Sequence, residues 1–147
     1  LCDRRQRQMC IRDSYKDVED RLLKFAVIIS KYNGKWVFCK HKKRTTYECP
    51  GGHRENGETI EATAKRELWE ETGAKTFALT PVCVYSVIKD GQESFGMLYF
   101  AKIDSLGELP PLEIERIEFF DSLPSLWTYP DIQPVLFQKV SDTILTQ

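Results

Sequence analysis

The feature that most constrains this 147-residue chain is a group of glutamates at the end of a predicted helix. The helix is expected over Thr59–Thr72, with Thr59 as its N-cap and Gly73 as the residue that ends it. At about 100° per residue, three glutamates in the last turns share one third of the helix circumference: Glu67, Glu70 and Glu71. These carboxylates repel one another and oppose the negative end of the helix macrodipole. A hard cation such as Mg²⁺ or Mn²⁺ would offset that repulsion; the alternative is a solvated acidic face.

The residues before the helix complete a pattern of fixed spacing. Gly51 and Gly52 follow Pro50, and glycine lets the backbone approach where a side chain would block it. From Gly52, five residues lead to Glu58 and seven more lead to Arg66. The stretch GHRENGETIEATAKRELWEETGA, residues 52–74, resembles the Nudix box, G-x5-E-x7-R-E-U-x-E-E-x-G-U, at every fixed position. Ala74 stands where a bulkier aliphatic residue is usual.

The resemblance implies a loop–helix–loop motif that hydrolyses a diphosphate linked to another moiety. It implies metal ligands at Glu67, Glu70, Glu71 and the Gly51 carbonyl. Arg66 would orient the carboxylates, and Glu58 would pair with Arg66 and brace the loop. Mg²⁺ suits this reaction because it neutralises phosphate charge and lowers the pKa of a bound water that attacks phosphorus in line.

Many members of the family add a further base or metal ligand from a later loop. Glu113 matches that position best by its spacing to Phe119-Phe120, and Glu115 is the reserve. The alternative for either residue is a surface acid beside a strand.

The remaining sequence indicates one domain. Apolar or β-branched runs predict strands at residues 22–30, 36–39, 82–88, 95–103 and 117–120, and a closing helix is expected over 134–144. Hairpin turns are expected at Asn33-Gly34 and Asp90-Gly91. The order of strands, helix, strands and helix favours an α+β fold, an α/β/α sandwich with a mixed sheet as in Nudix proteins, over residues 15–147.

Residues 1–14 are expected to be a non-native or disordered extension. They contain four arginines, show no apolar periodicity, and resemble translated sequencing-adaptor read-through. As a real segment they would be a basic arm for phosphates.

Composition excludes several classes of protein. The 21 basic and 22 acidic residues give a net charge of -1, which argues against a globally basic nucleic-acid binder. No apolar run approaches the roughly 20 residues that span a bilayer. The five cysteines show no metal-ligand spacing, so we expect reduced thiols in a cytoplasmic protein. No membrane association and no protein partner are implied by the sequence.

The substrate is expected to be a nucleotide. The short chain is similar to the MutT-like branch of the family, and RTTYECPGG with the box that follows it resembles firmicute proteins described both as 8-oxo-dGTP diphosphatases and as RNA 5′-pyrophosphohydrolases. We therefore expect Mg²⁺-dependent cleavage of a nucleoside triphosphate to monophosphate and pyrophosphate, with 8-oxo-dGTP as a candidate substrate. The alternatives are an RNA 5′-pyrophosphohydrolase that initiates mRNA decay and a non-catalytic nucleotide-binding module.

The residues expected to contact the nucleotide lie in three places. Gly51 and Gly52 would line the loop, Trp127 would stack on a purine, and Asp131 or Gln133 would bond its edge. Arg44, in the basic run Lys40–Arg44, would hold the outer phosphates or the 5′ end of an RNA, with Lys42 as the other candidate. The stretch of residues 126–133 before the last predicted helix lacks the asparagine that often hydrogen-bonds the base in MutT-like proteins. Core packing of Trp127 and a solvated basic loop are the alternatives.

Overall fold

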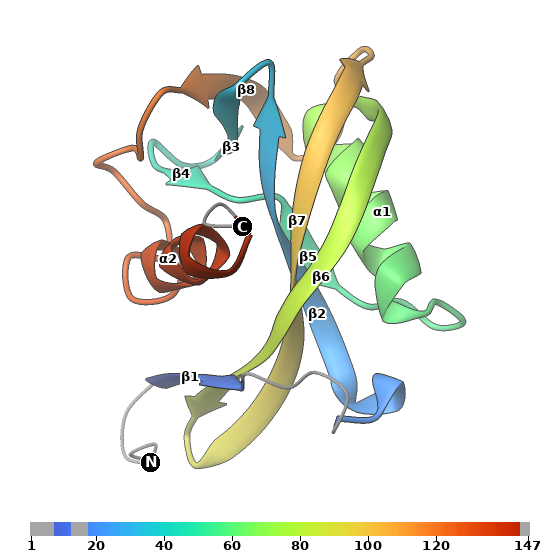
Figure 1. The fold of residues 1–147 in the computed structure, drawn as a ribbon, viewed down its shortest axis with the longest axis vertical. Helices are drawn as coiled ribbons and strands as arrows, with labels where there is room; N and C mark the ends of the chain where they lie inside the picture. The colour runs from blue at the N-terminus through green and yellow to red at the C-terminus, as the bar shows by residue number, and fades with distance from the viewer. Residues whose placement is uncertain (1–7, 13–17, 145–147) are drawn as a thin grey trace.

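A mixed β-sheet runs through the middle of the molecule (Figure 1). The structure is a computed structural model that describes residues 8–12 and 18–144. The strands are β1 (Gln8–Arg12), β2 (Leu23–Tyr32), β3 (Lys35–His41), β4 (Tyr47–Glu48), β5 (Gly51–His53), β6 (Ala74–Lys89), β7 (Gln92–Leu106) and β8 (Ile114–Phe120). The helices are a short 3-10 turn, η1 (Asp20–Leu22), and the α-helices α1 (Ile60–Thr72) and α2 (Gln133–Thr143).

The sheet order is β1-β6-β7-β2-β3-β4, with β5 paired to β2 and β8 paired to β3. Strands β2 and β7 run parallel, while the other pairs are antiparallel.

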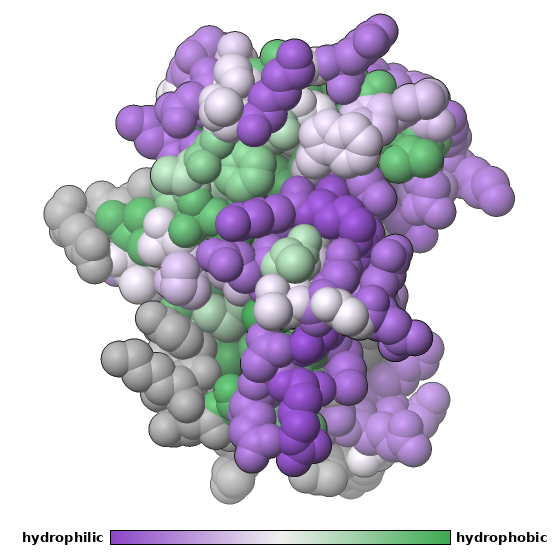
Figure 2. Space-filling model, turned by 90° about the vertical axis from the view of Figure 1, so that its right-hand side faces the viewer, coloured by the Kyte–Doolittle hydropathy of each residue, from purple (hydrophilic) through white to green (hydrophobic). Residues whose placement is uncertain are grey.

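The two α-helices cover opposite faces of this sheet (Figure 1). Ala26 and Ile28 of β2 share one buried cluster with α1, and Ile29 shares the other with Leu136 of α2. A strand that is covered on both faces must be apolar at successive positions, which explains the run Phe25–Ile29. The predicted α/β/α sandwich with a mixed sheet is therefore confirmed. The outer side of the molecule, to the right in Figure 1, is mostly hydrophilic (Figure 2).

The predicted hairpin turns are present, whereas the predicted strand lengths were too short. Asn33 and Asp90 have φ of 50° and 53°, each followed by a glycine with positive φ, as a type I′ turn requires. Strands β6 and β7 extend well beyond the predicted runs, from Ala74 to Leu106. Most of residues 74–81 of β6 are exposed and form no apolar run, so the prediction from apolar runs did not include them. Register shifts also interrupt the pairing of the two strands.

Strand β1 lies inside the segment that we expected to be a non-native or disordered extension. It pairs with residues 84–88 of β6, and Met9 and Ile11 pack against the core on the α2 side. An unpaired strand edge readily accepts an extended segment, so residues 8–12 are ordered here. The rest of residues 1–14 lies outside the described residues, and the origin of the segment stays a prediction.

Two further sequence expectations can be compared with the structure. In the described part of the chain, no helix is long and apolar enough to cross a membrane. Cys39, Cys49 and Cys83 are buried and form no disulfide, as expected of reduced thiols, but Cys10 is disulfide-bonded.

Candidate active site

Helix α1 begins and ends where its sequence predicts. The Thr59 hydroxyl accepts a hydrogen bond from the Ala62 N–H at 3.1 Å, which satisfies a free donor of the first turn. Gly73 adopts a left-handed φ of 78° and donates its N–H to the Trp69 carbonyl. The last turn contains no basic residue that would offset the acids there.

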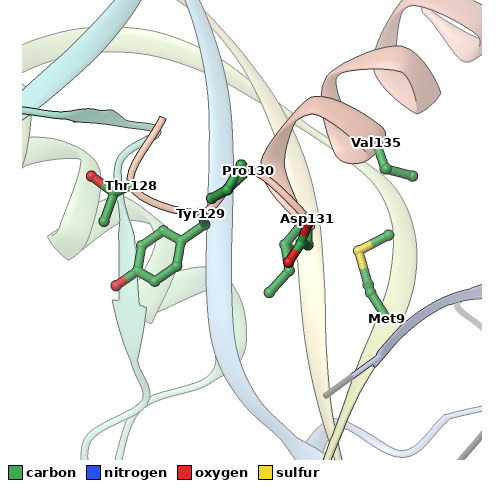
Figure 3. Close-up of a pocket in the computed structure, with 7 residues that line it drawn as sticks. Met9, Thr128, Tyr129, Pro130, Asp131 and Val135 are labelled. Atoms are coloured by element: carbon green, nitrogen blue, oxygen red, sulfur yellow. The ribbon is translucent and has the colours of Figure 1, made fainter. Parts of the chain in front are cut away.

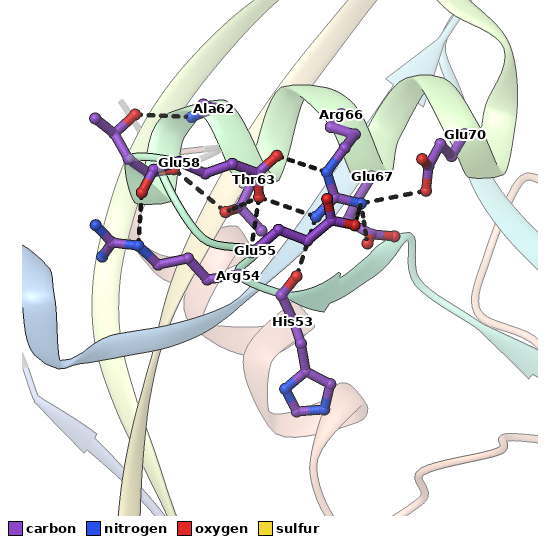
Figure 4. Close-up of polar contacts among 10 residues, drawn as sticks. His53, Arg54, Glu55, Glu58, Ala62, Thr63, Arg66, Glu67 and Glu70 are labelled. Carbon is purple, nitrogen blue, oxygen red and sulfur yellow. Dashed lines mark hydrogen bonds and ion pairs between the residues drawn. The ribbon is translucent and has the colours of Figure 1, made fainter.

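Arg66 joins the helix to the loop that precedes it (Figure 4). Its Nε and Nη2 donate to the two carboxylate oxygens of Glu58, at 2.6 and 3.0 Å. Its Nη1 lies 2.8 Å from Glu67 Oε1 and 3.3 Å from Glu70 Oε2. Nη2 also donates to the His53 carbonyl, at 3.0 Å. One guanidinium thus connects the loop, strand β5 and two carboxylates of the helix.

The Arg66 contact also determines the charge state of Glu58. Hydrogen bonds from Arg66 lower the pKa of Glu58 to about 2, helped by the Glu55 N–H and the Thr63 hydroxyl. The same pairing with Glu58 raises the pKa of Arg66. Both side chains therefore carry full charge over the ordinary pH range.

Glu71 lies beside the double glycine and is half-buried. The Gly51 N–H donates to Glu71 Oε1 at 2.7 Å. Burial raises the pKa of Glu71 to about 8, against the lowering effect of the Gly51 hydrogen bond, and the charges of Glu67, Glu48 and Glu113 raise it further. Burial also raises the pKa of Glu67 despite its contact with Arg66. The neighbouring side chains and N–H groups compensate the negative charge of the Glu67 and Glu71 carboxylates only in part.

The carboxylates are not arranged as a finished metal site. Among the residues that the structure describes, no three acidic, histidine or cysteine side chains form a group that could hold an ion as they stand. The hydrogen bonds explain this: Arg66 holds Glu67 and Glu70, while the Gly51 N–H holds Glu71. A bound ion would require these flexible side chains to turn.

The residues nevertheless fit a hard divalent cation. A Cβ on Gly52 would collide with the Glu67 carboxylate, so the space beside this carboxylate depends on that glycine. A Cβ on Gly51 would lie 2.5 Å from the Ala26 carbonyl oxygen. The donors are carboxylate and carbonyl oxygens, the ligands that Mg²⁺ and Mn²⁺ prefer. In the part of the chain that the structure describes, no cationic side chain pairs with the half-buried Glu71.

A cleft of about 500 Å³ opens beside these residues, on the side of the sheet that α2 covers. Of the residues proposed from the sequence, six line it: Gly51, Gly52, Glu71, Arg44, Glu113 and Gln133. Glu67 and Glu70 do not line it, because they turn toward Arg66.

Three of the side chains that line the cleft and were proposed from the sequence have defined partners: Arg44, Gln133 and Glu113. Arg44 Nη1 lies 2.8 Å from Glu48 Oε1. The buried Gln133 accepts the Cys49 N–H at 2.8 Å through its side-chain oxygen. The exposed Glu113 carboxylate lies 3.7 Å from the His41 ring nitrogen.

Trp127 and Asp131 do not join the cleft, contrary to the prediction. Trp127 packs edge-to-face on Phe38 in the core, with ring centroids 5.3 Å apart. Asp131 lines a separate pocket of about 320 Å³ between β1 and the start of α2 (Figure 3). The reason is the path of the backbone: Tyr47 pairs with the Leu126 carbonyl and the Thr128 N–H, which directs Trp127 inward.

Other residues of the cleft were not singled out from the sequence as contacting the nucleotide. Glu48 precedes Gly51 by three positions, so its place beside the double glycine was a usable signal. Tyr129 lines both pockets, two residues from Trp127. Phe25 had no local signal, because it reaches the cleft through the long-range pairing of β2 with β5.

Comparisons with known proteins agree with this geometry. Residues 20–136 match the NUDIX domain family. The protein named "Putative 8-oxo-dGTP diphosphatase YtkD" from Bacillus subtilis (strain 168) is 38% identical over 79 residues, which are 54% of this chain and 49% of that protein. This chain therefore aligns with about half the length of that relative.

Solved structures show the same fold. The Bacillus subtilis pyrophosphohydrolase BsRppH superposes with a TM-score of 0.81 over 97% of this chain and 95% of that one, at 26% identity. A MutT NUDIX hydrolase from Burkholderia pseudomallei gives a TM-score of 0.63 at 22% identity, over 79% and 95% of the two chains, and is similar in fold alone. Since the family match covers most of the chain, this protein belongs to the NUDIX domain family.

Proposed function

We propose that this protein is a Mg²⁺-dependent pyrophosphohydrolase that cleaves a nucleoside triphosphate to its monophosphate and pyrophosphate, with 8-oxo-dGTP as a candidate substrate. One observation carries the proposal: a half-buried carboxylate, Glu71, lies at the cleft beside Gly51, on the same helix as Glu67 and Glu70. The named activity of the YtkD relative supports the choice of nucleotide.

The residues of the motif would divide the work. Glu67, Glu70, Glu71 and the Gly51 carbonyl would hold Mg²⁺, which when bound neutralises phosphate charge and acidifies water. Arg66 would hold the helix carboxylates in place, braced by its two hydrogen bonds to Glu58. Glu113 is exposed and lines the cleft, so it is the candidate for accepting the proton of the attacking water.

The rest of the cleft would bind the nucleotide. Arg44 presents a guanidinium suited to phosphate oxygens, and Gly52 lines the same cleft without a side chain. The Cys49 N–H holds the carbonyl oxygen of Gln133, so the amide NH₂ is the group that Gln133 offers to a base. Phe25 lies over Gly96, where a Cβ would collide with its ring, and gives the cleft an aromatic surface for stacking.

An RNA 5′ end is the second candidate substrate. The fold likeness to the pyrophosphohydrolase BsRppH, over nearly the full length of both chains, favours it. Exposed Lys42 and Lys43 adjoin Arg44 and would meet the phosphates of a longer substrate. A non-catalytic nucleotide-binding module has less support, because none of the motif glutamates is missing.

The test is pyrophosphate release with Mg²⁺ from 8-oxo-dGTP, dGTP, the other nucleoside triphosphates and a 5′-triphosphorylated RNA. Glu70→Gln should lower turnover by about 100-fold or more, because an ionised oxygen ligand is lost. Glu61→Gln, a surface change on the same helix, is the matched control. Absence of product from every substrate with either Mg²⁺ or Mn²⁺ would overturn the proposal. Preference for RNA over all free nucleotides would replace it with the second candidate.

A further inference from the structure

Glu48 is a largely buried acid of the cleft that lies outside the glutamates of the Nudix motif. Its side chain is 12% exposed, and it lines the cleft together with Glu71. The negative charge of Glu48 contributes to the raised pKa of Glu71, which places the two carboxylates near one another. A second acid at this point would by itself repel a polyphosphate, so its presence requires an explanation.

The partner of Glu48 is Arg44, four positions earlier. Arg44 Nη1 lies 2.8 Å from Glu48 Oε1, and the guanidinium carbon lies 6.0 Å from the centroid of the Tyr129 ring. The backbone of Glu48 is fixed by β4, which pairs with Cys39 of β3. A carboxylate on the sheet thus holds a long side chain that extends from a loop.

We propose that Glu48 is a positioning residue that keeps the Arg44 guanidinium in the cleft, ready for the outer phosphates of the substrate. The inference rests on the proposed function, in which Arg44 binds those phosphates. Arginine has several N–H donors, and the pair with Glu48 uses Nη1, which leaves donors for a phosphate. The side chain would otherwise lose much rotamer freedom when substrate binds, so prior ordering by Glu48 strengthens binding.

The proposal predicts the direction in which KM changes when Glu48 loses its charge. If Glu48 only repelled phosphate or competed for Arg44, removing its charge would tighten substrate binding. If Glu48 positions Arg44, removing its charge weakens binding and leaves the chemical step intact. The change in KM for Glu48→Gln therefore separates the two.

The experiment is a double-mutant cycle with Glu48→Gln and Arg44→Ala, measured by steady-state kinetics on the triphosphate that the wild-type protein hydrolyses best. Glu48→Gln should raise KM about 3- to 10-fold with kcat within about twofold. Arg44→Ala should raise KM about 10- to 100-fold. The double variant should show no further rise in KM over Arg44→Ala, because Glu48 acts through Arg44 and its unpaired charge would only repel the phosphates. Glu48→Asp, whose shorter carboxylate withdraws from Arg44, should change KM in the same direction.

Matched controls separate positioning from damage to the fold. Glu19→Gln removes an exposed carboxylate that pairs with Arg21 outside the cleft lining, and should leave KM unchanged. The Mg²⁺ concentration for half-maximal activity should be the same in Glu48→Gln as in wild type. A lower KM for Glu48→Gln, additive effects in the double variant, or a shifted Mg²⁺ requirement would overturn the role of Glu48. An inactive wild-type protein would instead overturn the proposed function.

Discussion

The two neighbouring glycines of the cleft have different neighbours, so their substitution should have different effects. A Cβ on Gly51 would meet backbone atoms of Ala26 and Val27, which cannot move without disturbing β2. A Cβ on Gly52 would meet only the end of the Glu67 side chain, which can turn away. We expect Gly51→Ala to destabilise the fold by about 1–3 kcal/mol. Gly52→Ala should keep the thermal stability but lower kcat, because the displaced carboxylate is a proposed metal ligand.

Thermal unfolding and pyrophosphate release on both alanine variants check this contrast. Equal loss of stability in the two variants would contradict the assignment of Gly52 to the space beside Glu67.

A second prediction at the level of single residues concerns a buried hydroxyl. Within the described residues, Ser30 Oγ is the buried side-chain polar atom without a hydrogen-bond partner. Since an unpaired buried hydroxyl opposes folding, Ser30→Ala should leave the free energy of unfolding unchanged or raise it by up to about 1 kcal/mol. Thr63→Val is the control, because the Thr63 hydroxyl donates to Glu58 and its loss should destabilise the protein. Urea unfolding of both variants measures the difference, and a destabilised Ser30→Ala would contradict it.

At the level of the element, helix α1 carries an acid of the site, Glu71, whose protonation affects the stability of the protein. The pKa of Glu71 is raised to about 8 by burial, above its ordinary value of 4.5. Between these two pH values the folded protein holds a proton on Glu71 that the unfolded chain releases. This contribution to stability is full below pH 4.5 and is lost as the pH rises through about 8.

Metal-free protein should therefore melt at a lower temperature at pH 8.5 than at pH 6, and Glu71→Gln should reduce this difference. Differential scanning calorimetry in EDTA is the measurement. Mg²⁺ should raise the melting temperature of the wild type at pH 8.5 more than that of Glu71→Gln. An unchanged pH dependence in Glu71→Gln would show that Glu71 is not the group responsible.

The segment before α2 packs against the core, whereas the first residue of α2 reaches the cleft. Trp127 packs on Phe38, whereas Gln133 is fixed by the Cys49 N–H at the cleft. We expect Trp127→Leu to destabilise the fold by about 2–4 kcal/mol without altering the ratio of kcat/KM values between two nucleotides. Gln133→Leu should change that ratio, because it removes the amide proposed to meet the base. A changed ratio in Trp127→Leu would restore Trp127 as a base-stacking residue.

At the level of the whole molecule, β1 adds an edge to a sheet that already carries the cleft. None of the residues that line the cleft comes from β1, and the NUDIX match begins at residue 20. Protein that starts at Tyr15 should keep kcat/KM within about twofold of the full chain, with a lower melting temperature because Met9 and Ile11 no longer pack against the core. Loss of activity without unfolding would assign residues 1–14 a part in substrate binding.

The sequence by itself determined the parts of this protein that depend on neighbouring residues. The Thr59 cap, the left-handed Gly73 and the positive φ at Asn33 and Asp90 follow from local backbone preferences, and the structure contains all four. Helical periodicity likewise places Glu67, Glu70 and Glu71 on one side of α1.

Only the tertiary structure decided the walls of the cleft. Phe25 reaches the cleft because β2 pairs with His53 of β5, and Trp127 turns into the core because Tyr47 pairs with the residues on either side of it. Such contacts join residues far apart in the chain, so no local pattern encodes them. They depend on strand register and on competition for space in the core, which are settled when the whole chain packs.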